Sequence, residues 1–316
     1  MKNTITLPKA IILLLMLIPL ISCSDSSSDP MEVIPVNPIG DGGEDPTDPV
    51  DPPSSSSVQV ATYAAIKAAD GLAVDSNGNL FASSYGTSKV YKIDTNQAIS
   101  VFIENQPGAA GIVFNDQNEL CLARYNVSDI VKISDQGVLT TTIADGVLGT
   151  IALVFDTDGN LYTNNNVNST VTKIDANGVK TIINHTLYNN SSVTLDTNNN
   201  MYVSDYDSGK IIKIDAQTNT VSSFVNLPIN GGVGFIMYSN DYFYATALAD
   251  NVIYKIDMQG VAEIIAGIEG VAGSVNGNGD VATFNTPNGI AVSADGNTLY
   301  VAQQGGSGAI RVITGF

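Results

Sequence analysis

The sequence contains no tryptophan, a single histidine and only two cysteines. One histidine, His185, cannot supply the two or more imidazole ligands of a typical zinc or copper site, and a Ser-His-Asp triad could use only that residue. We interpret His185 as a surface residue at the end of an outer strand. Two cysteines, Cys23 and Cys121, exclude a disulfide framework. Cys121 alternates with apolar neighbours, so we expect it to be buried as a small hydrophobic residue.

Basic residues are also scarce. Lys and Arg number 13 against 31 Asp and Glu, which gives a formal net charge of −18 at pH 7. A surface that follows a phosphate backbone needs clustered Lys and Arg, so the composition excludes nucleic acid as a partner. Eight of the carboxylates lie within residues 24–57, where there is no Lys or Arg. The remainder of the chain is therefore less acidic than the total suggests, and its apolar residues are numerous enough for a substantial core.

The first 23 residues have the pattern of a bacterial lipoprotein signal. Lys2 and Lys9 precede an apolar run, residues 11–21, that is shorter than the roughly 20 residues needed to span a bilayer. Leu20-Ile-Ser-Cys23 resembles the lipobox, in which the cysteine becomes the lipidated first residue of the mature chain. The alternative is an ordinary secretory signal with an incidental cysteine. We predict a signal peptide over residues 1–22, a lipid on Cys23 and an extracytoplasmic location at the outer membrane, facing either the periplasm or the outside.

A linker and one domain should follow. Residues 23–57 are rich in Pro, Asp, Ser and Gly, so they cannot bury enough apolar surface to fold, and we expect a disordered tether. Residues 58–316 form the folded domain, which we expect to be a monomer.

From residue 70 onward a pattern of four short apolar runs recurs with a period near 40, which is the signature of propeller blades. Apolar anchor positions mark the copies at Leu80, Leu120, Leu161, Met201, Tyr242 and Leu299. Asn-Gly and Asp-Gly pairs between the first two runs are typical of tight hairpin turns. We interpret strings such as Asp156-Thr-Asp-Gly-Asn160 as these turns and not as calcium loops, because Val167 stands where an EF-hand needs a bidentate glutamate.

The two ends of the domain predict how the ring closes. The sixth unit stops at Phe316 without a fourth strand, and residues 58–65 have the composition of that missing strand. Pairing the two would leave no open edge in the ring. The sequence therefore predicts an all-β fold, a six-bladed β-propeller closed by an N-terminal strand.

The units resemble NHL repeats, and more broadly the six-bladed propellers of the senescence-marker-protein/gluconolactonase family. The resemblance is strongest over Ile264-Ile-Ala-Gly267, Gly277-Asn-Gly279 and Pro287-Asn-Gly-Ile-Ala-Val292. It implies the fold, but propellers serve as enzymes, scaffolds and binding modules alike.

Two sets of residues should gather on the propeller face that carries the mouth of the central channel. The first set precedes the innermost strands and consists of Asp70, Ala110, Ile151, Ser191, a position near Gly232 or Val233, and Asn288. The second set follows the second strands and consists of Ser84-Tyr85, Arg124-Tyr125, Asn165-Asn166, Asp205-Tyr206 and Gln303-Gln304. A glycine-rich segment, about residues 267–286, is long enough to cover the same mouth as a lid.

Asp70 and Asn288 are candidate metal ligands. Asp70-Gly71 and Asn288-Gly289 resemble the pairs that supply ligands in gluconolactonase-like propellers, and their oxygens suit Ca²⁺ or Mg²⁺. Ala110, Ile151 and Ser191 match none of the family's further ligands, which leaves Asp205 as the strongest additional candidate.

Tyr85, Tyr125 and Tyr206 fall at equivalent positions in three units, accompanied by Arg124 and Asp205. Aromatic rings with adaptable polar neighbours suit a sugar or peptide ligand, although the same rings could simply pack the corners of the blades. The leading hypothesis is a tethered, non-catalytic binding module for a small molecule, glycan or protein. The alternatives are a metal-dependent lactonase or related hydrolase, and an NHL-type protein scaffold.

Overall fold

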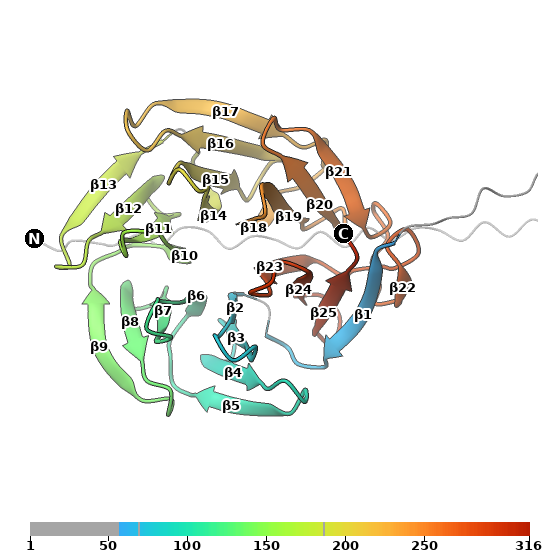
Figure 1. Cartoon of the computed structure of the whole chain (residues 1–316), viewed down its shortest axis with the longest axis horizontal. Helices are drawn as coiled ribbons and strands as arrows, with labels where there is room; N and C mark the ends of the chain where they lie inside the picture. The colour runs from blue at the N-terminus through green and yellow to red at the C-terminus, as the bar shows by residue number, and fades with distance from the viewer. Residues whose placement is uncertain (1–56, 69, 186) are drawn as a thin grey trace, which may run out of the picture. The chain divides into compact units, whose positions relative to one another are not determined.

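The computed structural model describes residues 57–316, except positions 69 and 186. The predicted signal peptide, the lipidated Cys23 and the linker up to residue 56 lie outside the described residues. Within the described residues the regular structure is entirely β, with 25 strands in six sheets around a central axis (Figure 1). The chain is a six-bladed β-propeller, as the repeats predict. No helix in the described part is long and apolar enough to cross a membrane.

The first five blades are four-stranded antiparallel sheets, numbered from the axis outward in chain order. Blade 1 contains β2 (Leu72–Val74), β3 (Leu80–Ser84), β4 (Lys89–Ile93) and β5 (Ile99–Ile103). Blade 2 contains β6 (Ala109–Phe114), β7 (Leu120–Arg124), β8 (Asp129–Ile133) and β9 (Leu139–Ala144). Blade 3 contains β10 (Thr150–Phe155), β11 (Leu161–Asn165), β12 (Thr170–Ile174) and β13 (Lys180–Asn184). Blade 4 contains β14 (Asn190–Leu195), β15 (Met201–Asp205), β16 (Lys210–Ile214) and β17 (Val221–Asn226). Blade 5 contains β18 (Val233–Ser239), β19 (Tyr242–Ala247), β20 (Val252–Asp257) and β21 (Ala262–Ala266).

Blade 6 joins the two ends of the domain. Its inner strands are β23 (Pro287–Val292), β24 (Thr298–Gln303) and β25 (Ala309–Thr314), and its fourth strand is β1 (Gln59–Ala64). Val60 lies opposite Ile313 in the antiparallel pair of β1 and β25. The predicted closure by residues 58–65 is therefore confirmed, and the hydrogen-bonded edge of the last blade is covered by the first strand.

The segment predicted as a lid lies elsewhere. It adds the two-residue strand β22 (Gly277–Asn278) to the outer edge of β1. The fully buried Arg311 holds it there, with hydrogen bonds from its guanidinium to the carbonyl oxygens of Thr283 and Val275 at 2.7 and 2.9 Å. The lid prediction was wrong because these contacts of Arg311, which no repeat predicts, hold the segment on blade 6 and away from the channel mouth.

In blades 1, 3 and 4 the turn between the first two strands is built on an aspartate. The Asp156 Oδ1 atom accepts the backbone N–H groups of Asp158 and Asn160 at 3.0 and 2.8 Å, and Asp75 and Asp196 repeat this arrangement. These carboxylates close hairpins, which confirms the interpretation of the Asp-Gly strings as structural turns.

The core lies between the blades. The anchor leucines and Met201 are buried, and Cys121 is fully buried among apolar side chains, where burial raises the pKa of its thiol to about 12. In blade 5 the anchor is displaced by one residue: Phe243 is buried and pairs with Ile256, whereas the predicted Tyr242 is 38% exposed. The reason is a two-residue turn, Asn240-Asp241, in which both residues have positive φ, in place of the longer aspartate turns.

Candidate functional site

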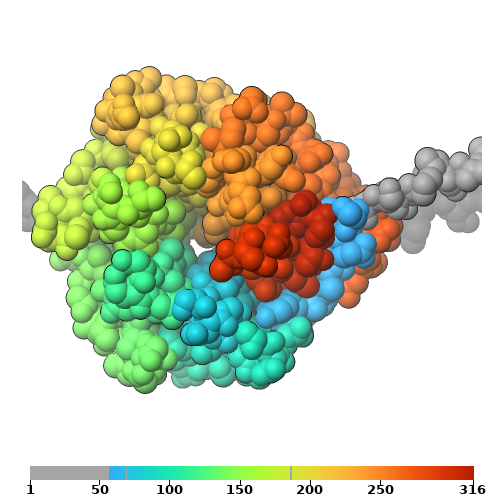
Figure 2. Space-filling model, viewed as in Figure 1, coloured from blue at the N-terminus to red at the C-terminus, as the bar shows by residue number. Residues whose placement is uncertain are grey.

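A cavity of about 330 Å³ lies at one end of the propeller axis. Its wall combines members of the two predicted sets with Asn189 and Phe235, but Ser84, Arg124, Asn165, Asp205 and Gln303 of the second set do not line it. It is lined by Asp70, Tyr85, Ala110, Tyr125, Ile151, Asn166, Asn189, Ser191, Tyr206, Gly234, Phe235, Asn288 and Gln304. In blade 5 the residue equivalent to Asp70 and Asn288 is Gly234. The sequence predicted a position near Gly232 or Val233, and the difference arises because the register of this blade is shifted. We call this space the mouth cavity. Figure 2 shows the molecule along the propeller axis, with a narrow opening at the centre of the ring.

The innermost strands approach one another closely at this level. A Cβ atom on Gly71 would lie 2.6 Å from the carbonyl oxygen of Ala110, and one on Gly289 would lie 2.2 Å from that of Asp70. Only glycine fits at such distances. The Asp-Gly and Asn-Gly pairs that suggested metal ligands therefore also have a packing role.

The three predicted tyrosines all line the mouth cavity. Tyr85 donates its hydroxyl hydrogen bond to Asn126 Oδ1 at 2.8 Å, and Tyr125 donates to Asn166 Oδ1 at 3.2 Å. Their rings meet edge to face with centroids 5.9 Å apart. Each of these two tyrosines thus both bridges to the next blade and lines the cavity, so both interpretations of the sequence apply to them. Tyr206 differs: it is 44% exposed, and its hydroxyl has no hydrogen-bond partner among the described residues.

A chain of amides continues from Tyr125 around the rim. Asn166 Nδ2 donates to Asn189 Oδ1 at 2.7 Å, and Asn189 Nδ2 donates to Asp207 Oδ2 at 3.0 Å. The terminal carboxylate accepts only, so it fixes the direction of every hydrogen bond in the chain. The rim is therefore held in one arrangement before any ligand arrives.

Asp70 is the only charged side chain that lines the mouth cavity in the described part of the chain. Its Oδ2 atom accepts the backbone N–H of Tyr85 at 2.7 Å. Burial raises the pKa of this carboxyl group, and the hydrogen bond from Tyr85 offsets part of that rise.

Arg124 and Asp205 do not line the cavity. Arg124 forms a bidentate ion pair with Asp129, at 2.8 and 2.5 Å, and a hydrogen bond to Gln106 at 3.2 Å. Asp205 accepts hydrogen bonds from the Asp207 backbone and the Ser208 hydroxyl at 2.9 and 3.0 Å. Both side chains shape the loops that carry the neighbouring tyrosines.

His185 follows β13 and forms hydrogen bonds with the Leu187 backbone and the Asn190 side chain. It also lies outside the cavity wall.

The metal candidates Asp70 and Asn288 share the cavity, but the donor set around them is poor. Ca²⁺ or Mg²⁺ takes about six oxygen ligands, with carboxylates to offset the loss of hydration. Among the described residues no group of three or more His, Cys, Asp and Glu side chains could hold a metal ion, and Asp205 is turned into its own loop. The residues of the mouth cavity do not fit a hard divalent cation.

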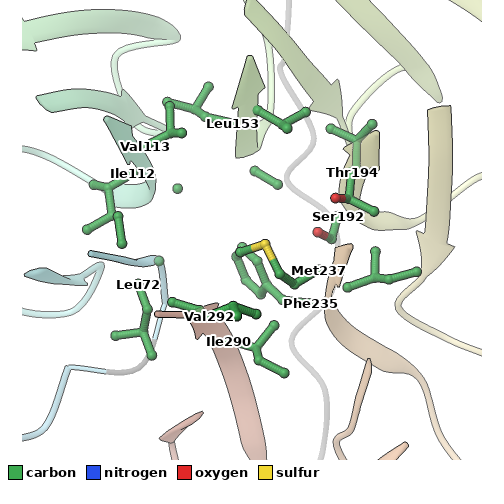
Figure 3. A pocket seen from close by; sticks show the side chains of 18 of the residues that line it. Leu72, Ile112, Val113, Leu153, Ser192, Thr194, Phe235, Met237, Ile290 and Val292 are labelled. Atoms are coloured by element: carbon green, nitrogen blue, oxygen red, sulfur yellow. The ribbon is translucent and has the colours of Figure 1, made fainter. Parts of the chain in front are cut away.

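A second, apolar cavity of about 210 Å³ lies along the same six innermost strands, and Phe235 lines both spaces. Figure 3 shows Leu72, Ile112, Leu153, Ile290 and other apolar side chains around it. We call this space the apolar chamber. Phe235 thus stands between a polar mouth and an apolar interior.

No family model matches the chain, and no curated protein matches it. Solved structures do. A gluconolactonase of Xanthomonas campestris is 12% identical with a TM-score of 0.67, over 81% of this chain and 89% of that one. An auxiliary nutrient binding protein of Bacteroides thetaiotaomicron is 15% identical with a TM-score of 0.68, over 81% and 76%. A virginiamycin B lyase of Staphylococcus aureus is 17% identical with a TM-score of 0.58, over 78% and 80%. At such identities the similarity establishes the propeller fold alone.

Proposed function

We propose that this chain is a binding module that holds a small polar molecule in the mouth cavity without transforming it. The observation that carries the proposal is the composition of the wall: aromatic rings, amides and a single carboxylate around a concave space on the axis. The hydrogen-bonded rim is pre-organised, which reduces the entropy lost on binding. The solved propeller named as a nutrient binding protein is consistent with such a role.

The proposal includes a location. We propose that a lipid on Cys23 tethers a monomeric propeller to the outer membrane, and that residues 23–57 link this anchor to the propeller. The support is the sequence around Cys23.

A metal-dependent lactonase is the second candidate. Asp70 and Asn288 do share one cavity, and a gluconolactonase is among the similar folds. The weakness of this candidate is the ligand set, because one carboxylate and one amide leave most coordination positions of a hard cation unfilled. A protein scaffold is supported less, since a concave polar cavity occupies the face where such a surface would lie.

Tyr206 offers the clearest test of the binding site. Its exposed ring has no hydrogen-bond partner in the described residues, so Tyr206→Ala should leave the fold intact. Saturation-transfer NMR with a panel of monosaccharides, amino acids and amines would first identify molecules that bind the wild-type protein. Titration calorimetry should then show that Tyr206→Ala weakens their binding about tenfold, which corresponds to about 1.4 kcal/mol.

Tyr188→Ala is the matched control. Tyr188 is 88% exposed and lies outside the mouth cavity, so this variant should bind as the wild type does. If no compound binds, or if both variants lose affinity equally, the mouth cavity is not the binding site.

A further inference from the structure

The charge that lines the mouth cavity is negative. Asp70 brings one carboxylate, and no Lys, Arg or His of the described chain lines the space. The five ion pairs of the described residues do not include Asp70. Within the described part of the chain its side chain accepts one hydrogen bond, from the backbone N–H of Tyr85. Asp70 is partly buried and has no cationic partner among the described residues. Burial of an unpaired carboxylate costs free energy, and a ligand that supplies positive charge would offset that cost.

The aromatic rings favour the same sign of charge. Tyr85, Tyr125, Tyr206 and Phe235 bring rings to the cavity from blades 1, 2, 4 and 5. The face of an aromatic ring is electronegative, and several rings around one space attract an ammonium group.

Two tyrosine hydroxyl groups of the wall are left as hydrogen-bond acceptors. The hydroxyl hydrogens of Tyr85 and Tyr125 are donated to amide oxygens, and Asn166 and Asn189 each donate an N–H along the rim. An amide oxygen has two lone pairs, so the oxygens of Asn166 and Asn189 can accept a further bond. Asn166 and Asn189 thus each keep one N–H and one lone pair, whereas Tyr85 and Tyr125 have donated their hydroxyl hydrogens and can only accept from a ligand.

The propeller as a whole also carries an excess of negative charge. When the eight carboxylates of residues 24–57 are set aside, 23 of the 31 remain in the propeller sequence, against 11 of the 13 basic residues. An excess of negative charge raises the local concentration of cations and speeds their association.

We propose that the mouth cavity binds a small organic cation, with Asp70 as its counter-ion and the tyrosine rings around its ammonium group. An organic ammonium group suits this wall better than Ca²⁺ because it needs no shell of six oxygens. The inference rests on the proposed binding function and narrows it to one class of ligand.

The test compares ligands of equal shape and different charge. Tetramethylammonium, choline and butylammonium would be titrated calorimetrically into the full chain in detergent, together with 3,3-dimethylbutan-1-ol, the neutral counterpart of choline. We expect at least one cation to bind, choline to bind at least tenfold more tightly than its neutral counterpart, and binding to weaken with salt.

Two sets of variants assign the effect to named groups. Asp70→Asn keeps an acceptor for the Tyr85 N–H but removes the charge, and it should lower cation affinity at least tenfold. Glu263→Gln removes one exposed charge on β21, outside the cavity, and should leave affinity unchanged. Tyr206→Leu should lose affinity and Tyr206→Phe should retain it, because the ring and not the hydroxyl faces the cation.

The outcomes separate the two proposals. If none of the cations binds, if choline and its neutral counterpart bind equally, or if Asp70→Asn binds cations like the wild type, the cation proposal is wrong. Should a neutral sugar then bind in a manner that depends on Tyr206, the proposed binding function stands without it. If nothing in either panel binds, both proposals fail.

Discussion

At the level of residues, neighbours at the end of a second strand can point to different places. The last residue of the strand turns into the loop, and the residue after it lines the mouth cavity. Arg124 and Asp205 end β7 and β15 and turn into their loops, whereas Tyr125 and Tyr206 line the mouth cavity. The sequence places all four at the channel mouth, because the repeat determines the level along the axis. It cannot separate the two members of each pair, since that depends on where each strand leaves its sheet and on partners such as Asp129.

Phe235 and Asn189 were missed for different reasons. Phe235 lies in blade 5, where the short Asn240-Asp241 turn shifts the register and hides the equivalence to the other blades. Asn189 lies in a loop that the repeat does not align. Its role appears only when Asn166 and Asp207 are seen on either side of it.

Asp70 should make the protein less stable at neutral pH. Its pKa in the folded state is raised by burial, so the folded state disfavours the ionised form more than the unfolded chain does. The stability that the protonated group contributes is full below its ordinary pKa of 3.8 and is lost as the pH rises through the folded-state value. Asp70→Asn, which has no charge to lose, should therefore melt above the wild type at pH 7, by about 2–4 °C for each kcal/mol recovered.

Melting curves at two pH values check this. The advantage of Asp70→Asn should shrink between pH 7 and pH 3.5. If the variant melts below the wild type at pH 7, the carboxylate stabilises the fold. If it melts above the wild type by the same margin at both pH values, the gain does not come from the loss of the charge.

At the level of elements, the strands could be predicted because each one repeats a short apolar pattern about 40 residues after the last. The closing strand was predictable for a related reason: the sixth unit lacks a fourth strand, and a sheet edge needs a partner. The position of residues 267–286 was not predictable, because it depends on one buried cation. The carbonyl oxygens that Arg311 binds belong to irregular backbone that no repeat describes.

Removal of β1 should cost several kcal/mol. A chain that begins at Lys67 lacks the partner of β25 and leaves β22 without its neighbour. The uncovered edge and the core around Ile313 should lower the melting temperature by more than 10 °C and promote aggregation. A chain that begins at Ser57 keeps β1 and is the control. Equal melting of the two chains by calorimetry would mean that the other three strands of blade 6 suffice.

At the level of the whole molecule, ring closure determines where the chain joins the propeller. Ser57 donates a hydrogen bond from its hydroxyl to the Gly315 carbonyl at 2.7 Å, and β1 follows as the fourth strand of blade 6. The mouth cavity lies on the axis and is lined chiefly by residues that flank the inner strands, whereas β1 lies toward the outside of the ring (Figure 1). The chain therefore joins the domain away from the site, which suits a tethered domain that must take up ligand.

The anchor itself is the last prediction. Lipidation needs the thiol of Cys23, so Cys23→Ala should move the protein from the membrane fraction to the soluble extracytoplasmic fraction. Cys121→Ala changes the other cysteine, which is buried in the propeller, and this control should stay in the membrane fraction. Fractionation followed by immunoblotting measures both. If Cys23→Ala remained wholly in the membrane fraction, the tether would have to be sought in the propeller or in an uncleaved apolar segment.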